Sequence, residues 1–382
     1  MLRRVIRGGE RADRVVAELR RLRPSWDDET WARVREAILD VIRHRLLLEA
    51  AGGSAEPRHV LATWHVMREL RVPVPLGRID EPLVRARLTE LGGDFRIRES
   101  VPEWLDAVAE AELGREPWRA LMAALNQPAR LYVRVNTLKT RLPELSARLR
   151  ASGAEAIEVD GFPDALALTM ARSVYATAEH AAGLLEVQDA ASQAVSYRLG
   201  VTGGMRVIDG CAGAGGKTLH LAALMGNRGR LLALDTDAEK LETLRRRARR
   251  AGAGIVEARL VDTTKVVKRR HGSADRLLLD VPCSGLGVLR RNPEARWRLT
   301  PESLDRLRSL QREILTRYAP LVKPGGKMAY VTCSILTSEG EAQVRWFLEG
   351  QGEEWALERE ERFGPPRQDT DCFYIALLIR RG

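Results

Sequence analysis

Two cysteines and one aspartate stand where they could act together on a single substrate. Asp280 and Cys283 lie in the segment Asp-Val-Pro-Cys-Ser-Gly, and Cys333 lies in Tyr-Val-Thr-Cys-Ser. A thiolate is a nucleophile that can form a covalent intermediate, and a nearby carboxylic acid can stabilise the charge that develops. A lone cysteine is more often a small buried residue. Because both cysteines follow an expected strand, we take them as candidate catalytic residues.

A glycine-rich segment, residues 209–218, is a second candidate site. It follows an expected strand and begins an expected helix with the sequence Asp-Gly-Cys-Ala-Gly-Ala-Gly-Gly-Lys-Thr. A nucleotide-binding P-loop would need glycine where the chain has Cys211, and a dinucleotide-binding turn would need Gly-x-Gly-x-x-Gly. A tight turn without a ligand and a site for S-adenosylmethionine both remain, since glycines allow the backbone to approach a ligand closely.

Acidic residues at the ends of the next two expected strands favour S-adenosylmethionine. Asp235 stands about 20 residues beyond the glycines, where a carboxylate can accept hydrogen bonds from ribose hydroxyls. Asp262 could accept a hydrogen bond from the adenine amino group. The expected cofactor site consists of Cys211, Ala212, Gly213, Ala214, Gly215, Gly216, Lys217, Asp235, Asp262 and Asp280.

An α/β domain with a doubly wound parallel sheet would position these residues. From about residue 200 strand and helix patterns alternate, which predicts helices on both faces of the sheet. Ligands of such folds bind beyond the carboxyl ends of the strands. We therefore expect the two thiols, Asp280 and the glycine-rich segment to meet at one edge. The expected strands are residues 206–209, 231–235, 258–262, 276–280 and 327–332.

The rest of the chain divides into two further parts. Residues 1–98 carry apolar residues at helical spacing, with arginines on the opposite faces that fit solvent and RNA equally well. Residues 99–185 mix strand and helix patterns and predict a small α+β module. The sequence thus predicts three domains, the third being residues 186–382.

Composition restricts the class of protein. The 62 Lys and Arg residues exceed the 52 Asp and Glu residues, for a net charge of +10 that suits a polyanionic partner. No apolar run approaches the ~18 residues of a membrane helix, and the N-terminus lacks a secretory pattern. The four cysteines form no Cys-x-x-Cys pair, so no zinc or other metal site is expected. We expect a cytoplasmic protein without a membrane partner.

Paired thiols beside a methyl donor suit methyl transfer to carbon 5 of cytosine. That carbon is too weak a nucleophile until a thiolate adds at carbon 6. An acid near ring nitrogen 3 would stabilise the charge formed during the addition. A base must then remove the carbon 5 proton before the thiol can leave. The target cytosine must also leave its stack to reach such a pocket.

Three motifs in this order resemble the RsmB/NOP2/Sun family of RNA cytosine-5 methyltransferases. They are residues 209–218, residues 280–293 and residues 330–334, and the resemblance extends over about residues 99–382. It implies a Rossmann-like class I methyltransferase domain at 186–382, preceded by an RRM-like module. It also implies S-adenosylmethionine as cofactor and a NusB-like RNA-binding domain at residues 1–98.

The resemblance also implies a role for each site residue. Cys333 corresponds to the nucleophile, and Cys283 to a cysteine that assists release of methylated RNA. DNA cytosine methyltransferases attack with the Pro-Cys position instead, so only the resemblance separates the two thiols. Asp280 would contact the cofactor and orient or protonate the base, and Lys217 would support the site electrostatically. The RNA contacts implied are Arg134, Asn136, Arg290, Arg291, Asn292 and Trp297.

The substrate expected from the resemblance is RNA, specifically 16S ribosomal RNA, bound by a monomer. Members with a helical N-terminal domain resemble small-subunit ribosomal RNA enzymes. A transfer RNA methyltransferase and a non-catalytic RNA-binding or ribosome-assembly factor remain as alternatives. The chain departs from the usual family residues at Gly213, Ala214, Gly340 and Cys372, and none of these departures removes a proposed catalytic group.

Overall fold

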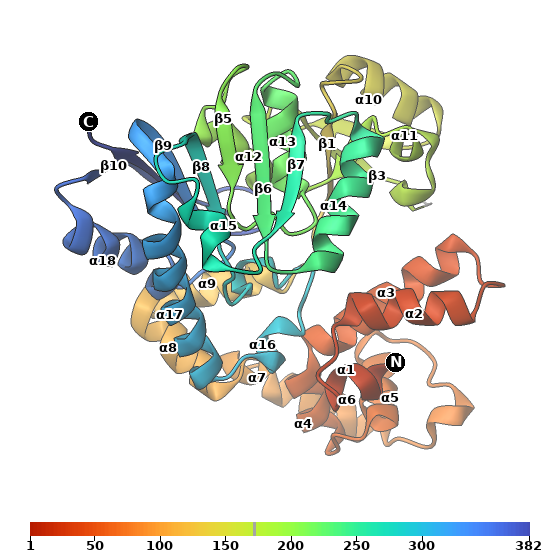
Figure 1. Cartoon of the computed structure of the whole chain (residues 1–382). Helices are drawn as coiled ribbons and strands as arrows, with labels where there is room; N and C mark the ends of the chain where they lie inside the picture. Colours follow the sequence, from red (N-terminus) through yellow and green to blue (C-terminus); the bar gives the residue numbers. More distant parts are fainter. Residues whose placement is uncertain (171–172) are drawn as a thin grey trace. The chain divides into compact units, whose positions relative to one another are not determined.

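The chain forms two compact units, which Figure 1 shows in a computed structural model that describes residues 1–170 and 173–382. The first unit contains Met1–Pro128 and Val288–Pro301, and the second contains Ala129–Gly287 and Glu302–Gly382. This division places residues 99–128 with the helical unit, whereas the sequence put its boundary at residue 98. The three-domain division at 98 and 185 stays a prediction.

The first unit is helical, as the apolar spacing predicted. Buried residues such as Val15, Val41 and Leu48 recur at helical intervals and form its core. Asp27 caps one helix by accepting a hydrogen bond from Thr30 N. The helices are α1 (Leu2–Ile6), α2 (Ala12–Leu22), α3 (Asp28–Arg43), α4 (Arg45–Gly52), α5 (Pro57–Met67), α6 (Glu81–Leu91), α7 (Phe95–Arg98), α8 (Glu103–Leu113), α9 (Arg115–Leu125) and α16 (Ala295–Arg298).

The second unit contains a small antiparallel sheet with the strand order β2-β3-β1-β4. Its strands are β1 (Leu131–Val135), β2 (Glu155–Glu158), β3 (Ala165–Thr169) and β4 (Leu185–Val187). Helix α10 (Leu142–Ala151) packs Leu145 and Leu149 against the apolar face of this sheet. The expected α+β module is confirmed.

A seven-stranded sheet with the order β10-β11-β9-β8-β5-β6-β7 forms the rest of the second unit. The five strands from β9 to β7 run parallel, whereas β10 and β11 pair antiparallel at one edge. The expected doubly wound fold is therefore confirmed. The strands are β5 (Arg206–Asp209), β6 (Arg230–Asp235), β7 (Val256–Leu260), β8 (Ala274–Asp280), β9 (Val322–Thr332), β10 (Trp355–Phe363) and β11 (Phe373–Arg380).

Helices and two apolar clusters cover this sheet. One cluster contains Leu219 and Leu244, and the other contains Leu315 and Phe347. The helices of the second unit are α11 (Ala178–Ala181), α12 (Ala190–Leu199), α13 (Gly216–Leu224), α14 (Ala238–Ala251), α15 (Thr264–Lys268), α17 (Pro301–Tyr318) and α18 (Glu341–Gln351). Among the described residues, no helix combines the length and apolarity needed to cross a membrane.

Candidate functional site

The two candidate thiols meet beyond the carboxyl ends of neighbouring strands. Strands β8 and β9 are paired in parallel, with Asp280 opposite Val331, so the segments that follow them emerge at the same edge. Cys283 Sγ lies 3.4 Å from Cys333 Sγ. Both side chains are free and partly exposed. The structure therefore brings together the two cysteines that the sequence singled out.

A buried carboxylate, Glu339, holds both cysteine segments. Its Oε1 accepts hydrogen bonds from Ser284 N and Gln311 Nε2, both at 2.9 Å. Its Oε2 accepts one from Ser334 Oγ at 2.6 Å. Ser284 and Ser334 directly follow the two cysteines, and their hydroxyl oxygens lie 3.1 Å apart. One side chain thus fixes the position of both thiols.

Sequence reasoning did not identify Glu339 as part of the site. The groups that donate hydrogen bonds to Glu339 come from two loops and from helix α17. One of them is the backbone N–H of Ser284, which a sequence motif cannot reveal. The available signal was the repeated Cys-Ser pair, because hydroxyls that follow two clustered thiols need a shared acceptor when they are buried.

Gly287 adds a backbone connection between the same segments. Its N–H donates to Cys333 O at 2.9 Å, and its carbonyl accepts from Cys372 N at 2.9 Å. A Cβ atom at position 287 would collide with the carbonyl oxygens of Cys333 and Cys372. The close approach of these backbone segments therefore requires glycine at position 287. Cys372, one of the departures from the usual family residues, is buried at this contact.

The contact between the two thiols affects the pKa of Cys283. The contact with Cys333 and burial together raise the pKa of Cys283 well above its ordinary value. Cys283 therefore keeps its proton, and its thiol lies within hydrogen-bonding distance of Cys333 Sγ.

A cavity of about 240 Å³ lies at the ends of β5 and β8, and neither Cys283 nor Cys333 lines it. Gly215 in the loop before α13 has φ +87°, and a Cβ there would press on Leu244, whereas Gly216 faces open space. Glycine is therefore required at position 215, whereas position 216 has room for a side chain. The lining residues are Gln188, Ser192, Asp209, Cys211, Ala212, Gly213, Ala214, Gly216, Lys217 and Asp280.

The polar groups of this cavity fit the amino-acid end of S-adenosylmethionine. Asp209 Oδ1 is buried and has no hydrogen-bond partner among the described residues, while Oδ2 accepts from Thr218 Oγ1 at 2.7 Å. An unpaired buried carboxyl oxygen is suited to an ammonium donor. Burial, with a smaller contribution from the charge of Asp280, raises the pKa of Asp209 to about 7.

Lys217 and Asp280 form the charged pair of the site. Lys217 Nζ donates to Asp280 Oδ2 at 2.7 Å and lies 4.9 Å from the centre of the Phe373 ring. Cys211 lines the same cavity, but burial and the nearby acidic groups raise the pKa of its thiol well above the ordinary value. Cys211 is therefore a neutral wall residue rather than a competing nucleophile.

Asp235 and Asp262, the acidic residues expected to bind the ribose and the adenine, differ in their position relative to the glycine-rich loop. Asp235 ends β6, and its Oδ2 accepts from Gly213 N at 2.7 Å, so it supports the glycine-rich loop directly. Asp262 is exposed and lies two residues beyond the end of β7, because that strand ends earlier than expected. Neither residue lines the cavity. Their contacts with the cofactor stay predictions.

Arg134 and Asn136, two of the expected RNA contacts, are buried and hydrogen-bonded within the second unit. Arg134 is almost fully buried, and its Nη1 donates to Gln188 Oε1 and, at 2.8 Å, to Gly216 O. Asn136 Nδ2 donates to Gly183 O at 2.7 Å and to Ala251 O at 2.8 Å. These bonds connect β1 and the residue after it to helices α13 and α14. The RNA contacts of both residues stay predictions.

The segment Val288–Pro301 belongs to the helical unit, although it directly follows the Cys283 loop in the chain. Arg290 is buried, and its Nη2 donates to Pro128 O at 2.7 Å. Trp297 Nε1 donates to Ile42 O at 3.1 Å. These bonds place two of the expected RNA-contacting residues in the packing of the first unit. Arg291 and Asn292 are partly exposed, and their RNA contacts stay predictions.

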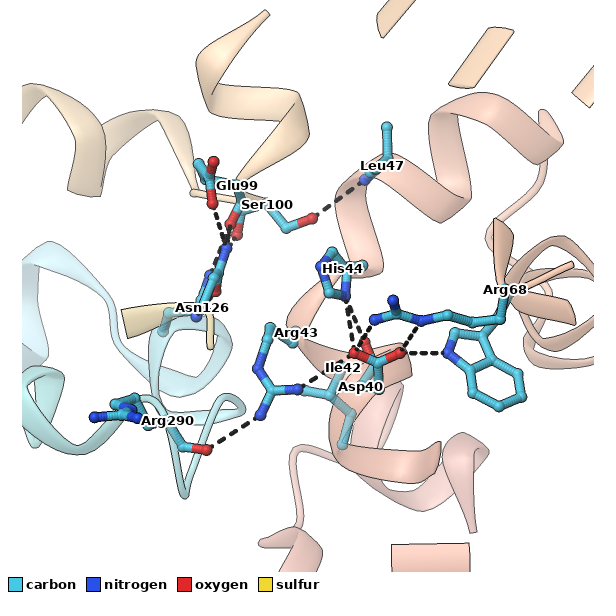
Figure 2. A network of polar contacts seen from close by, with 12 residues as sticks. Asp40, Ile42, Arg43, His44, Leu47, Arg68, Glu99, Ser100, Asn126 and Arg290 are labelled. Atoms are coloured by element: carbon cyan, nitrogen blue, oxygen red, sulfur yellow. Dashed lines mark hydrogen bonds and ion pairs between the residues drawn. The ribbon is translucent and has the colours of Figure 1, made fainter. Parts of the chain in front are cut away.

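Figure 2 shows the polar network that receives this segment. Arg43 bonds to Asp40 Oδ1 at 3.3 Å and to Arg290 O at 3.1 Å. Burial alone would raise the pKa of Asp40, but hydrogen bonds from His44, Trp64 and Arg68 outweigh it and lower the pKa. The carboxylate is therefore charged and holds Arg43 in position.

Arg296 is a second buried anchor in this segment, which sequence reasoning missed. Its side chain is fully buried. Its Nη1 donates to Glu99 O and its Nη2 to Asn126 Oδ1, each at 2.8 Å. Burial lowers the pKa of Arg296 to about 9. Residues 288–301 are thus fixed by the helices around them.

No group of three or more His, Cys, Asp or Glu side chains in the described part of the chain could hold a metal ion.

Two family models match the chain. The model described as 16S rRNA methyltransferase RsmB/F matches residues 197–379, and a ferredoxin-like domain of RsmF/B-like methyltransferases matches residues 101–175. The second match agrees with the RRM-like module expected from the sequence.

Curated relatives carry related names. The probable ribosomal RNA small subunit methyltransferase B of Synechocystis is 37% identical over 282 residues, which cover 73% of this chain and 63% of that protein. The corresponding protein of Bacillus subtilis is 33% identical over 300 residues, which cover 74% and 67%. The chain therefore spans about two thirds of the length of these relatives.

Solved structures share the fold. The protein PH0851 superposes with a TM-score of 0.79 at 27% identity, over 92% of this chain and 90% of that chain. A methyltransferase homolog protein from Pyrococcus horikoshii gives 0.67 at 26% identity, over 76% and 98%. NSun6 from the same organism, solved with SFG, gives 0.67 at 20% identity, over 74% and 98%, which shows the fold alone.

Proposed function

The chain belongs to the RsmB/F family of 16S rRNA methyltransferases, and we propose that it methylates carbon 5 of a cytosine in 16S ribosomal RNA. The methyl donor of this family is S-adenosylmethionine. The observation that carries the proposal is the thiol pair, with 3.4 Å between Cys283 Sγ and Cys333 Sγ. Methylation of oxygen or nitrogen needs no thiol, because those atoms already carry lone pairs.

The first step assigned to the protein is addition of Cys333 to the base. The Cys333 thiolate forms a bond to carbon 6, and the electron pair of the ring double bond makes carbon 5 nucleophilic. Lys217 and Asp280, joined at 2.7 Å, would orient the base by hydrogen bonds and stabilise the charge that develops on it. The cofactor, when bound, supplies an electrophilic methyl group to carbon 5.

The second step is release of the product. A base removes the proton from carbon 5, the ring double bond reforms, and the bond between carbon 6 and Cys333 Sγ breaks. Cys283 keeps its proton and lies within hydrogen-bonding distance of the departing sulfur. It therefore stabilises the thiolate that leaves. A variant without Cys283 would complete the addition and methyl transfer but release the RNA slowly.

The test is methylation of purified 16S ribosomal RNA with S-adenosylmethionine that carries an isotopically labelled methyl group. Digestion to nucleosides and mass spectrometry should give labelled 5-methylcytidine with the wild type and none with Cys333→Ala. Label in an N-methylated or O-methylated nucleoside would contradict the chemistry. Label in transfer RNA but not in 16S RNA would contradict the substrate, and absence of label from every RNA would favour a non-catalytic RNA-binding factor.

A further inference from the structure

A second cavity, of about 360 Å³, lies in the same unit but shares no lining residue with the site described above. It lies between the small sheet's strand β4, the segment before it and helix α14. Basic and aromatic side chains dominate its walls, which are Tyr175, His180, Glu186, Val187, Arg247 and Arg250. None of these residues has a part in the proposed methyl transfer.

The charges in this cavity do not cancel. Arg247 Nη2 pairs with Glu186 Oε2 at 2.9 Å, and Arg250 Nη2 pairs with Glu186 Oε1. Burial would raise the pKa of Glu186, but the two guanidinium groups outweigh it and lower the pKa. One carboxylate thus neutralises one of two guanidinium charges. The remaining positive charge suits a single phosphate group.

His180 orients the Arg250 side chain and adds no charge to the cavity. Its Nε2 lies 2.8 Å from Arg250 Nη1. Burial and the charge of Arg250 lower the pKa of His180, so the ring is neutral and accepts this hydrogen bond. The bond fixes the Arg250 guanidinium, and a fixed guanidinium loses less entropy when it binds an anion.

Tyr175 gives the cavity an exposed aromatic surface. Its side chain is 63% exposed, and its ring meets the His180 ring edge to face with 5.1 Å between the centres. Large exposed aromatic rings next to arginine are the usual platform on which single-stranded RNA bases stack. The edge-to-face contact with His180 holds the Tyr175 ring in position and leaves one face of the Tyr175 ring open.

We propose that this cavity is a subsite for one nucleotide of the single-stranded RNA substrate. The base stacks on Tyr175, and its phosphate binds Arg247 and Arg250. The assignment of RNA as ligand rests on the proposed function. Arg247 also donates from Nη1 to Ala214 O at 2.7 Å, so the subsite adjoins the glycine-rich loop of the cofactor cavity. A nucleotide held here would belong to the strand next to the target cytosine.

The stacking part is tested with Tyr175→Ala and Tyr175→Phe, and Ile157→Ala is the matched control. Ile157 is 49% exposed on β2 of the same small sheet and outside the cavity. Fluorescence anisotropy with a short labelled oligocytidylate should show a dissociation constant about five-fold to one-hundred-fold higher for Tyr175→Ala. Tyr175→Phe and Ile157→Ala should match the wild type. Equal affinity of Tyr175→Ala and wild type would overturn the subsite.

The phosphate part is tested with Arg250→Gln by titrating the same RNA at several salt concentrations. Loss of one phosphate contact should lower the slope of log affinity against log salt by about one. An unchanged slope would overturn the phosphate assignment. Thermal unfolding of each variant confirms that the fold is kept.

Methyl transfer to 16S RNA, measured in parallel, separates this proposal from the proposed function. If the wild type methylates RNA and Tyr175→Ala binds the oligonucleotide equally well, the subsite fails and the function stands. If Tyr175→Ala weakens binding but the wild type transfers no methyl group to RNA, the subsite stands and the function fails.

Discussion

Ser284 and Ser334, fifty positions apart, place their hydroxyl oxygens 3.1 Å from each other because both bond to the carboxylate of Glu339. Each serine directly follows a cysteine of the thiol pair. The distance between the two sulfur atoms is therefore set by a buried carboxylate behind them. Catalysis by two thiols needs such a device, since a displacement of about 1 Å can cost about a hundredfold in rate.

Glu339→Gln should disturb the thiol pair while leaving RNA binding intact. A glutamine has one acceptor oxygen where Glu339 has two, so Ser334 Oγ must stop donating to residue 339 or Ser284 N loses its acceptor. We expect kcat for methyl transfer to fall about ten-fold or more, with KM for RNA nearly unchanged. Reaction with a trivalent arsenical that bridges adjacent thiols should also slow.

Glu341→Gln is the matched control for Glu339→Gln. Glu341 lies two residues further along, partly exposed, and pairs with Arg362. Its replacement should leave kcat and the arsenical reaction close to those of the wild type. Equal kcat for Glu339→Gln and the wild type would show that Glu339 does not position the thiols.

Asp209 should make stability depend on pH in a definite direction. Its carboxyl has a pKa of about 7 in the folded protein and near 4 in the unfolded chain. The folded state therefore holds a proton that the unfolded state has released between these values. Stability from this group is complete below about pH 4 and is lost as the pH rises towards 7, by up to about 1.4 kcal/mol per pH unit.

Urea unfolding of the wild type and of Asp209→Asn at pH 5 and at pH 7 measures this effect. The wild type should lose more stability than Asp209→Asn between the two pH values. Burial lowers the pKa of His220 to about 4, so His220 acts in the opposite direction, but it does so in both proteins and cancels in the comparison. Equal pH dependence of the two proteins would contradict a raised pKa for Asp209.

Arg296 should be essential to the stability of the helical unit. Arg296→Met would leave Asn126 Oδ1 buried without its donor and would remove one of the two side-chain donors to Glu99 O. We expect the free energy of unfolding of this unit to fall by about 3 kcal/mol. Arg298→Met, an exposed position on the same short helix, should change it by less than about 0.5 kcal/mol.

Tryptophan fluorescence during urea unfolding can follow this comparison. All tryptophans except Trp346 and Trp355 belong to the first unit, so the signal reports mainly on that unit. Similar midpoints for Arg296→Met and Arg298→Met would mean that the buried guanidinium contributes little to the fold.

The thiol pair and the glycine-rich loop could be predicted from sequence because strand order determines them. Once residues 276–280 and 327–332 are taken as parallel neighbours, their following loops must emerge at one edge. Strand order then brings the segments of Asp280, Cys283 and Cys333 to the same edge, and the bonds to Glu339 set the distance between the two thiols. The distance of Asp262 from the cavity depends instead on where β7 ends, and a shift of two residues in that strand was not visible in the pattern.

The environment of the arginines could not be predicted in the same way. Arg134, Arg290 and Arg296 are buried because backbone carbonyls accept their hydrogen bonds. Backbone acceptors are present at every position of a sequence, so the pattern does not reveal which of them face a guanidinium. The motifs therefore did not reveal that hydrogen bonds inside the protein hold the side chains of Arg134 and Arg290.

The most direct test of the account is a denaturing gel of labelled 16S RNA after reaction with S-adenosylmethionine and each cysteine variant. Cys333 is assigned as the nucleophile and Cys283 as the residue needed for release. Cys283→Ala should therefore accumulate a covalent protein–RNA adduct, and Cys333→Ala and the double variant should form none. An adduct that forms with Cys333→Ala and is absent with Cys283→Ala would contradict this assignment of the two thiols.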